Sequence, residues 1–165
     1  MKRILIAAAL AATVATPALA QEADTAAAET TFTGPRIGAE IGVADDDIFG
    51  TEGFTYGIEA GYDFDLGGAI AGIQAGIQDS DDTGRELSIG GRIGAPVSKN
   101  ALIYGNVAYS NIEVFEDFEI DGVRFGLGLE IAPTKNVYVK AEQRYANYEL
   151  GAELWQTVVG VGFRF

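Results

Sequence analysis

The last eleven residues of the chain alternate between two kinds of side chain. From Trp155 to Phe165 every second residue is apolar or aromatic, with Thr157 as the exception. Successive side chains of a β-strand point to opposite faces, so this segment predicts a strand with one apolar face and one small or polar face. A final strand that is apolar outward and ends on an aromatic residue is typical of a transmembrane β-barrel. The residues of the opposite face are Gln156, Val158, Gly160, Gly162 and Arg164.

The other end of the chain has the pattern of a secretory signal peptide. Residues 1–3 include two basic side chains, residues 4–14 are apolar, and Ala18, Leu19 and Ala20 form a small-residue cleavage site. A membrane-anchoring helix is the weaker interpretation, because the apolar run is shorter than the roughly 20 residues needed to span a bilayer and Pro17 interrupts it. We therefore predict cleavage after Ala20 and export from the cytoplasm.

Composition limits what the exported chain can be. Removal of residues 1–20 leaves 145 residues, the size of one domain, with nine basic and 24 acidic side chains and a net charge of −15. Such a charge argues against nucleic acid as a partner, because phosphates would be repelled. The chain has no cysteine, so disulfides do not stabilise it. No later stretch approaches 18 consecutive apolar residues, so only a β-barrel could span a membrane.

Eight segments share the alternation of the last strand. One such segment is weak evidence, but an even number of segments of about ten residues is the sequence signature of a transmembrane barrel. In the fifth segment the phase is ambiguous, and we predict that Ile103, Val107 and Tyr109 face outward. The predicted fold is all-β, an eight-stranded antiparallel up-and-down transmembrane β-barrel over residues 32–165, preceded by a flexible periplasmic lead-in over residues 21–31. The segments are residues 35–43, 54–64, 69–78, 86–97, 101–110, 122–131, 137–146 and 155–165.

The breaks between segments also alternate. Those after the second, fourth and sixth segments are compact, and those after the odd-numbered segments are mostly longer and acidic: residues 44–53, 79–85, 111–121 and 146–153. Short turns of outer-membrane barrels lie on the periplasmic side, which predicts that both termini are periplasmic. The outward aromatic residues then form two girdles. One contains Phe54, Tyr56, Tyr109, Tyr145 and Trp155, and the other contains Tyr62, Phe64, Phe163 and Phe165.

These strands, the Ala18-Leu19-Ala20 site and the terminal Phe163-Arg164-Phe165 resemble the small eight-stranded outer-membrane β-barrels of Gram-negative bacteria, the family that includes the OmpA transmembrane domain, OmpX and opacity-protein-like barrels. The resemblance covers nearly the whole exported chain. It implies a cell-surface location, contact with membrane lipid and lipopolysaccharide, and recognition of the last strand by the barrel-assembly machinery. The family includes adhesins, stress-related barrels and small porin-like pores, so it leaves the activity open. The assembly signal would map onto Trp155, Val159, Val161, Phe163 and Phe165.

The inward faces of the predicted strands carry twelve charged side chains among glycines. Eight strands enclose only enough room for side chains, so we expect these charges to pair with one another. Two interpretations follow: a plug that fills the lumen, which we favour, or an ion path whose pairs exchange partners. The predicted network consists of Arg36, Arg92, Arg124, Lys140, Arg144 and Arg164 with Glu40, Glu59, Asp63, Glu86, Glu130 and Glu142.

The acidic breaks form a second candidate surface. Runs such as Asp45–Asp47 and Asp79–Asp82 would lie together on one rim, where they bind an extracellular partner, bridge to lipopolysaccharide through divalent cations, or simply remain solvated. We favour solvated loops and predict no metal site. Phe115 and Phe118 interrupt the acids of the third break, which suggests a protruding β-ribbon or an ordinary hairpin extension.

Catalysis is not expected. The chain has no histidine to act as a general base, and no glycine-rich segment opens a helix as a phosphate-binding loop would, so we predict no catalytic residue and no cofactor. A soluble lipocalin-like carrier would also have eight strands, but its apolar face would point inward and leave the inner glycines unexplained. The sequence therefore favours an outer-membrane barrel with a structural or surface-interaction role, with a small channel as the alternative.

Overall fold

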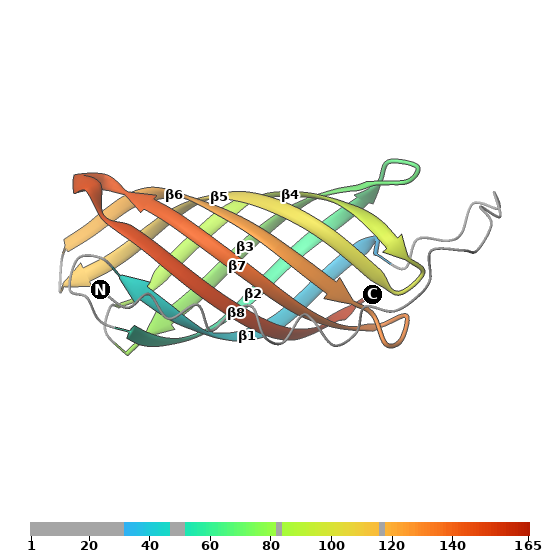
Figure 1. The fold of residues 1–165 in the computed structure, drawn as a ribbon, viewed down its shortest axis with the longest axis horizontal. Helices are drawn as coiled ribbons and strands as arrows, with labels where there is room; N and C mark the ends of the chain where they lie inside the picture. Colours follow the sequence, from blue (N-terminus) through green and yellow to red (C-terminus); the bar gives the residue numbers. More distant parts are fainter. Residues whose placement is uncertain (1–31, 47–51, 82–83, 116–117) are drawn as a thin grey trace, which may run out of the picture.

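The computed structural model describes residues 32–46, 52–81, 84–115 and 118–165. These residues form eight strands and one turn of 3-10 helix, η1, over Glu149–Gly151. Each strand pairs antiparallel with the next, and β1 pairs with β8, so the sheet closes on itself (Figure 1). The predicted fold class is confirmed. The strands are β1 (Gly34–Asp46), β2 (Glu52–Asp65), β3 (Ile70–Ser80), β4 (Glu86–Ser98), β5 (Ala101–Phe115), β6 (Phe118–Ile131), β7 (Val137–Tyr148) and β8 (Glu153–Arg164).

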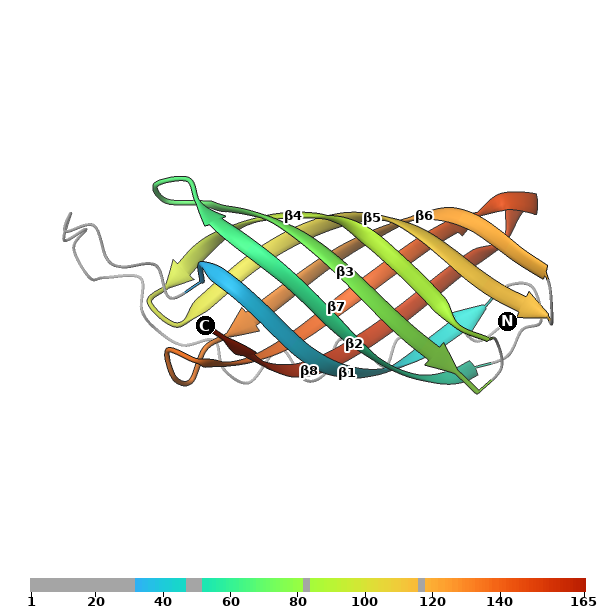
Figure 2. The same cartoon turned by 180° about the vertical axis from the view of Figure 1, so that it is seen from behind.

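The strands are strongly tilted. A line of paired residues that starts at Arg36 on β1 passes once around the barrel and returns to β1 at Asp46, ten residues further along the strand. Closing a barrel with such a stagger requires a tilt of roughly 35–45° from the barrel axis. Figures 1 and 2 show the strands as diagonals across both sides of the molecule. Because of this tilt, inward side chains from strands far apart in the sequence lie at the same depth in the lumen.

The barrel has two distinct ends. At one, which we call the short-turn end, β1 begins, β8 ends and short turns join β2 to β3, β4 to β5 and β6 to β7. It lies on the right in Figure 1. At the other, which we call the loop end, the remaining four connections lie. Gly67 and Gly68 of the β2–β3 turn have φ values of 77° and 117°, a backbone conformation that favours glycine.

Several strands extend further toward the loop end than the sequence pattern predicts. β5 continues to Phe115 and β6 starts at Phe118, although the predicted segments stop at 110 and start at 122. In the extension, side chains still alternate between the two faces, but the apolar ones now point inward and the acidic ones outward. Ile112 and Ile120 are paired with each other, inward and buried. The outer face therefore becomes polar before the strand ends. The long-loop prediction was wrong here, because it took this change of polarity for the end of the strand. The alternative prediction of an ordinary hairpin extension agrees with the paired strands.

The two faces of the sheet alternate as predicted. Most large hydrophobic side chains of the outer face are between 40% and 75% exposed, and Val137 and Tyr145 are half-buried. The ambiguous phase of β5 is settled, since Ile103 and Val107 face outward while Leu102 and Tyr104 are buried. Aromatic pairs mark both ends of the outer face: Tyr145 and Trp155 have ring centroids 4.9 Å apart. At the other end the rings of Tyr62 and Phe64 are 4.8 Å apart.

A buried apolar cluster lies inside each end of the barrel. The cluster at the short-turn end contains Phe32, Ile70, Leu102, Tyr104 and Ala132. The cluster at the loop end contains Ile112, Ile120, Ala146, Tyr148 and Ala152, with the partly buried Leu154 packed against it. The polar interior therefore lies between two apolar clusters.

Among the described residues, no helix is long and apolar enough to cross a membrane. The predicted signal peptide (1–20) and lead-in (21–31) lie outside the described residues, and so do Asp47, Asp82, Glu116 and Asp117 of the acidic breaks. The cleavage site and the division of the chain at residues 20 and 31 stay predictions.

Candidate functional site

Inward glycines give the polar side chains of the lumen their room. A Cβ on Gly128 would collide with the ring of Tyr104, and a Cβ on Gly38 or Gly162 would meet the hydroxyl of Tyr138 at or below 2.5 Å. A methyl group at any of these positions would have to displace an aromatic ring. The pattern of glycines on the inner face therefore fixes where the large side chains lie.

The first set of ion pairs, which we call the short-turn group, consists of Asp63, Arg92, Glu130 and Arg164. Arg92 donates to both oxygens of Asp63, at 2.8 and 2.6 Å, and to Glu130 at 2.8 Å. Arg164 donates to Asp63 at 2.8 Å and to Glu130 at 2.6 Å. Each guanidinium thus bonds both carboxylates, and no side chain of the group is more than 4% exposed.

The second set, the central group, consists of Arg36, Glu40, Glu59, Lys140, Glu142 and Arg144. Lys140 Nζ lies 2.8 Å from Glu40, 3.1 Å from Glu59 and 4.0 Å from Glu142. Arg144 contacts the same three carboxylates, at 2.7, 3.8 and 2.6 Å. Arg36 pairs with Glu59 and donates to Gln74 at 2.9 Å. Two cations therefore share one set of acceptors.

The third set, the loop-end group, is the pair of Glu86 and Arg124. Arg124 Nη1 donates to Glu86 Oε1 at 2.6 Å, and the hydroxyl of Ser110 donates to the same oxygen at 2.6 Å. Gln78 donates to the second oxygen of Glu86 at 3.3 Å, and Arg124 Nη2 donates to Ser88 at 3.1 Å. Neutral polar side chains thus complete the coordination of this pair.

Each of the three groups contains as many cations as anions. The structure brings together all twelve charged residues predicted for the lumen, and each makes at least one ion pair. The groups are linked, since Arg36 Nε lies 3.2 Å from Asp63 and Arg144 donates to Gln78 at 3.4 Å. Removing one partner of a buried pair leaves an uncompensated charge, which typically costs 3–5 kcal/mol.

Sequence reasoning missed the neutral part of the network. Tyr104 donates a hydrogen bond to Glu142 at 2.7 Å. The guanidinium of Arg92 stacks over the ring of Tyr104, 4.9 Å from its centroid. Gln156 donates to Thr55 at 2.8 Å. The alternation placed Gln74 and Gln78 on the inner face, but the search for paired charges passed over uncharged residues. The apolar clusters at the two ends were also missed. Phe32, Ile112 and Ile120 lie outside the predicted segments, and Ile70 and Leu102 lie inside them but were not recognised as part of a core.

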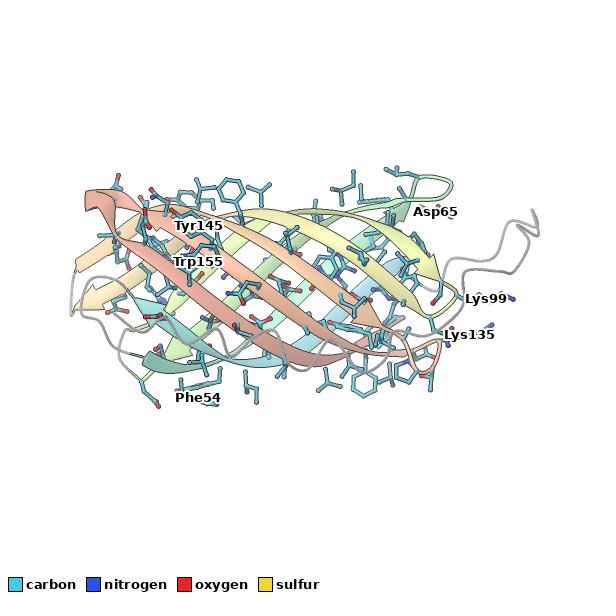
Figure 3. All side chains as sticks on the ribbon, in the orientation of Figure 1. Phe54, Asp65, Lys99, Lys135, Tyr145 and Trp155 are labelled. Carbon is cyan, nitrogen blue, oxygen red and sulfur yellow. The ribbon has the colours of Figure 1, made fainter. Side chains whose placement is uncertain are left out.

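Outside the lumen the two ends differ in charge. The loop end carries many acidic side chains and one described basic side chain, Arg85, which lies 3.4 Å from Glu119. Lys99 and Lys135 lie at the short-turn end with Asp65 (Figure 3). Among the described residues, no group of three acidic, histidine or cysteine side chains is placed to hold a metal ion. The acidic side chains described at the loop end are Asp45, Asp79, Asp81, Glu113, Glu119, Asp121, Glu149 and Glu153.

The residues predicted as an assembly signal lie along the outer face of β8. Trp155 and Val159 are each 50% exposed, and Phe165 is 75% exposed. Val161 and Phe163 lie between them on the same face and are also more than half exposed. The structure thus aligns all five side chains on one outward stripe, and their recognition by an assembly factor stays a prediction.

Solved structures of three bacterial proteins are similar to this fold. Neisserial surface protein A is 18% identical, with 81% of this chain and 98% of that chain covered and a TM-score of 0.60. The attachment invasion locus protein Ail of Yersinia pestis is 14% identical, with 81% and 97% covered and a TM-score of 0.55. The N-terminal β-barrel domain of Pseudomonas aeruginosa OprF is 19% identical, with 81% and 99% covered and a TM-score of 0.54. At these identities the likeness shows the fold alone.

No curated protein sequence matches the chain. The family profile described as outer membrane protein beta-barrel domain matches residues 6–165, which includes all eight strands. The closed sheet, the apolar outer face and the paired charges of the interior agree with that match. The chain therefore belongs to the outer membrane protein beta-barrel domain family of the bacterial outer membrane.

Proposed function

We propose that this protein has a structural or surface-interaction role in the outer membrane, and that its lumen is closed to ions and solutes. The observation that carries the proposal is the order of layers along the lumen: an apolar cluster at each end and three neutral ion-pair groups between them. An ion would have to displace buried, paired charges to pass, and breaking such pairs is expensive. The absence of histidine supports a role without catalysis.

The loop end is the surface that we propose to face outside the cell, with both termini in the periplasm. Its short-turn counterpart carries Lys99 and Lys135, whereas the loop end carries most of the acidic side chains of the described surface. Opposite charges attract, so the partner that fits is cationic, such as a basic protein surface. Ail has been crystallised with sucrose octasulfate, a polyanion, which the acidic loop end of this chain would repel.

Binding of whole cells to a lysine-rich peptide coated on a surface tests this part of the proposal. The triple variant Asp79→Asn, Asp81→Asn, Glu119→Gln should lower binding several-fold, because it removes three charges from the loop end. Asp65→Asn at the short-turn end is the matched control and should bind as the wild type does. Equal binding by all three proteins would contradict the surface role of the acidic residues.

A small channel for ions or small solutes is the second candidate. It is favoured by the shared acceptors of Lys140 and Arg144, which both lie within 4.0 Å of Glu40, Glu59 and Glu142. Two cations on three common carboxylates can exchange partners without leaving any charge unpaired.

Potassium release from loaded proteoliposomes separates the two candidates. If the lumen is closed, potassium should leave the proteoliposomes at the same rate as it leaves loaded vesicles without protein. Lys140→Met should leave that rate unchanged, because the apolar clusters at both ends remain. A channel predicts rapid release by the wild-type protein that changes in Lys140→Met.

We further propose that the outward stripe of β8 is recognised by the assembly machinery during insertion.

A further inference from the structure

Phe32, two residues before β1, lies inside the end of the barrel. Phe32 is 1% exposed and packs with Ile70, Leu102, Tyr104 and Ala132. Ile70 begins β3, Leu102 lies near the start of β5 and Ala132 follows β6, so the cluster occupies the mouth of the lumen at the short-turn end. Phe32 therefore occupies the mouth of the lumen at the short-turn end.

The backbone of Phe32 is tied to the same ion pairs. Arg164 Nη1 donates to the carbonyl oxygen of Phe32 at 2.8 Å and to Asp63 at 2.8 Å. Its second terminal nitrogen donates to Glu130 at 2.6 Å. The position of Phe32 and the hydrogen bonding of the short-turn group are thus coupled through one guanidinium.

Gly34 makes the inward course of the chain possible. Its φ is 97°, a conformation that residues with a side chain rarely adopt, and a Cβ there would lie 2.7 Å from the carbonyl oxygen of Phe165. The next residue, Pro35, accepts a hydrogen bond of 3.0 Å from the backbone of Phe165. The chain is therefore anchored to the barrel wall at Pro35 and turns at Gly34 to bring Phe32 into the mouth.

The two apolar clusters differ in how they are held. Ile112, Ile120, Ala146 and Tyr148 of the loop-end cluster belong to strands that are paired along their length. Phe32 lies outside every strand. It can leave the mouth without breaking any strand pair, whereas the four strand residues of the loop-end cluster can separate only if the sheet unzips; the fifth member, Ala152, follows η1.

We propose that Phe32 is a removable plug that closes the lumen at its short-turn end. This inference rests on the proposed closed lumen. Withdrawal of Phe32 takes one acceptor from Arg164 and exposes the short-turn group to water from one side. The barrel then remains closed at the loop end and becomes accessible at the short-turn end.

Thiol reactivity tests the proposal, since the chain has no cysteine of its own. Asn106 is a suitable reporter position, because it is 7% exposed and its side-chain amide makes no hydrogen bond within the described protein. Asn106→Cys is refolded into vesicles and treated with a small methanethiosulfonate reagent. Asn100→Cys in the exposed β4–β5 turn reports the unhindered rate, and heat-modifiable gel mobility verifies folding.

The plug predicts that Asn106→Cys reacts far more slowly than Asn100→Cys, and that adding Phe32→Ala raises its rate about tenfold or more, as expected when a local closure is lost. Phe32→Leu keeps an apolar side chain and should stay slow. Gly34→Ala should displace Phe32 by changing the backbone turn before β1, so Asn106→Cys should also react fast in this variant. It provides the test if Phe32→Ala fails to fold.

The failures are distinguishable. Fast reaction of Asn106→Cys with Phe32 intact would contradict the closed lumen and with it the proposed function. Slow reaction in folded Phe32→Ala and in folded Gly34→Ala would overturn the plug alone and leave the closed lumen standing.

Discussion

Tyr104 on β5 reaches across β6 and donates a hydrogen bond of 2.7 Å to Glu142 on β7. Gly128 of β6 is the register partner of both residues, and a Cβ at this position would collide with the ring of Tyr104. The contact therefore exists because the residue between its two partners is glycine. It joins an aromatic ring of the short-turn cluster to a carboxylate of the central group.

Gly128→Ala should destabilise the barrel by about 1–3 kcal/mol, because the added methyl group pushes Tyr104 away from Glu142. Urea unfolding of the refolded protein in lipid vesicles measures the loss. Tyr104→Phe, which removes only the hydroxyl, should lose about 1.5–3 kcal/mol, as for a hydrogen bond to a charged group. Wild-type stability in Gly128→Ala would contradict the described packing of Tyr104.

Arg144→Met should lower the free energy of unfolding by about 3–5 kcal/mol, because it removes a cation that pairs with Glu40 and Glu142 in the buried central group. Arg85→Met is the matched control. Its pair with Glu119 is 3.4 Å long and about half exposed on both sides, so its loss should change stability by less than about 1 kcal/mol. Similar unfolding midpoints for both variants would show that the central group is hydrated.

Leu127→Arg tests the lipid-facing surface. Leu127 is 73% exposed between Phe125 and Leu129 on the outer face of β6. A cation near the bilayer midplane costs about 2–4 kcal/mol. Leu66→Arg changes a 59% exposed leucine in the β2–β3 turn. It should change the free energy of unfolding by less than about 0.5 kcal/mol. A soluble barrel would tolerate both substitutions alike.

Phe165→Ala should lower the amount of barrel inserted in cells while leaving the stability of the refolded protein nearly unchanged. Phe165 is 75% exposed, so its ring contributes little packing, but it ends the outward stripe of β8. Quantification of folded protein in membrane fractions measures insertion. Phe64→Ala, at the same end on β2, should insert normally. Equal insertion of both variants would argue against a recognition signal at the C-terminus.

The fold and the charged lumen were predictable because one period governs the whole chain. Alternation of two residues assigns every strand residue to a face, so Arg36 and Glu142 could be placed in one lumen although they lie far apart in the sequence. The pairing within the lumen could not be predicted. It depends on the ten-residue stagger, which brings Lys140 beside Glu59, and alternation is the same at every register.

The ends of the barrel were not predictable for a different reason. Ile112 and Ile120 are apolar and inward, the reverse of the pattern in the middle of the barrel, because the sheet there has a polar outer surface and an apolar core. Phe32 precedes the first alternating segment, so periodicity gave no signal for it. Its burial follows from the turn at Gly34, which only the backbone geometry shows.

Single-channel conductance of the refolded protein, residues 21–165, in a planar bilayer tests the central claim most directly. The account predicts folded, inserted barrels that pass no current, because three neutral ion-pair groups and two apolar clusters fill the lumen. Heat-modifiable mobility of the same sample shows that the barrels are folded. Discrete current steps that grow with salt concentration would contradict the closed lumen and identify the protein as a small channel.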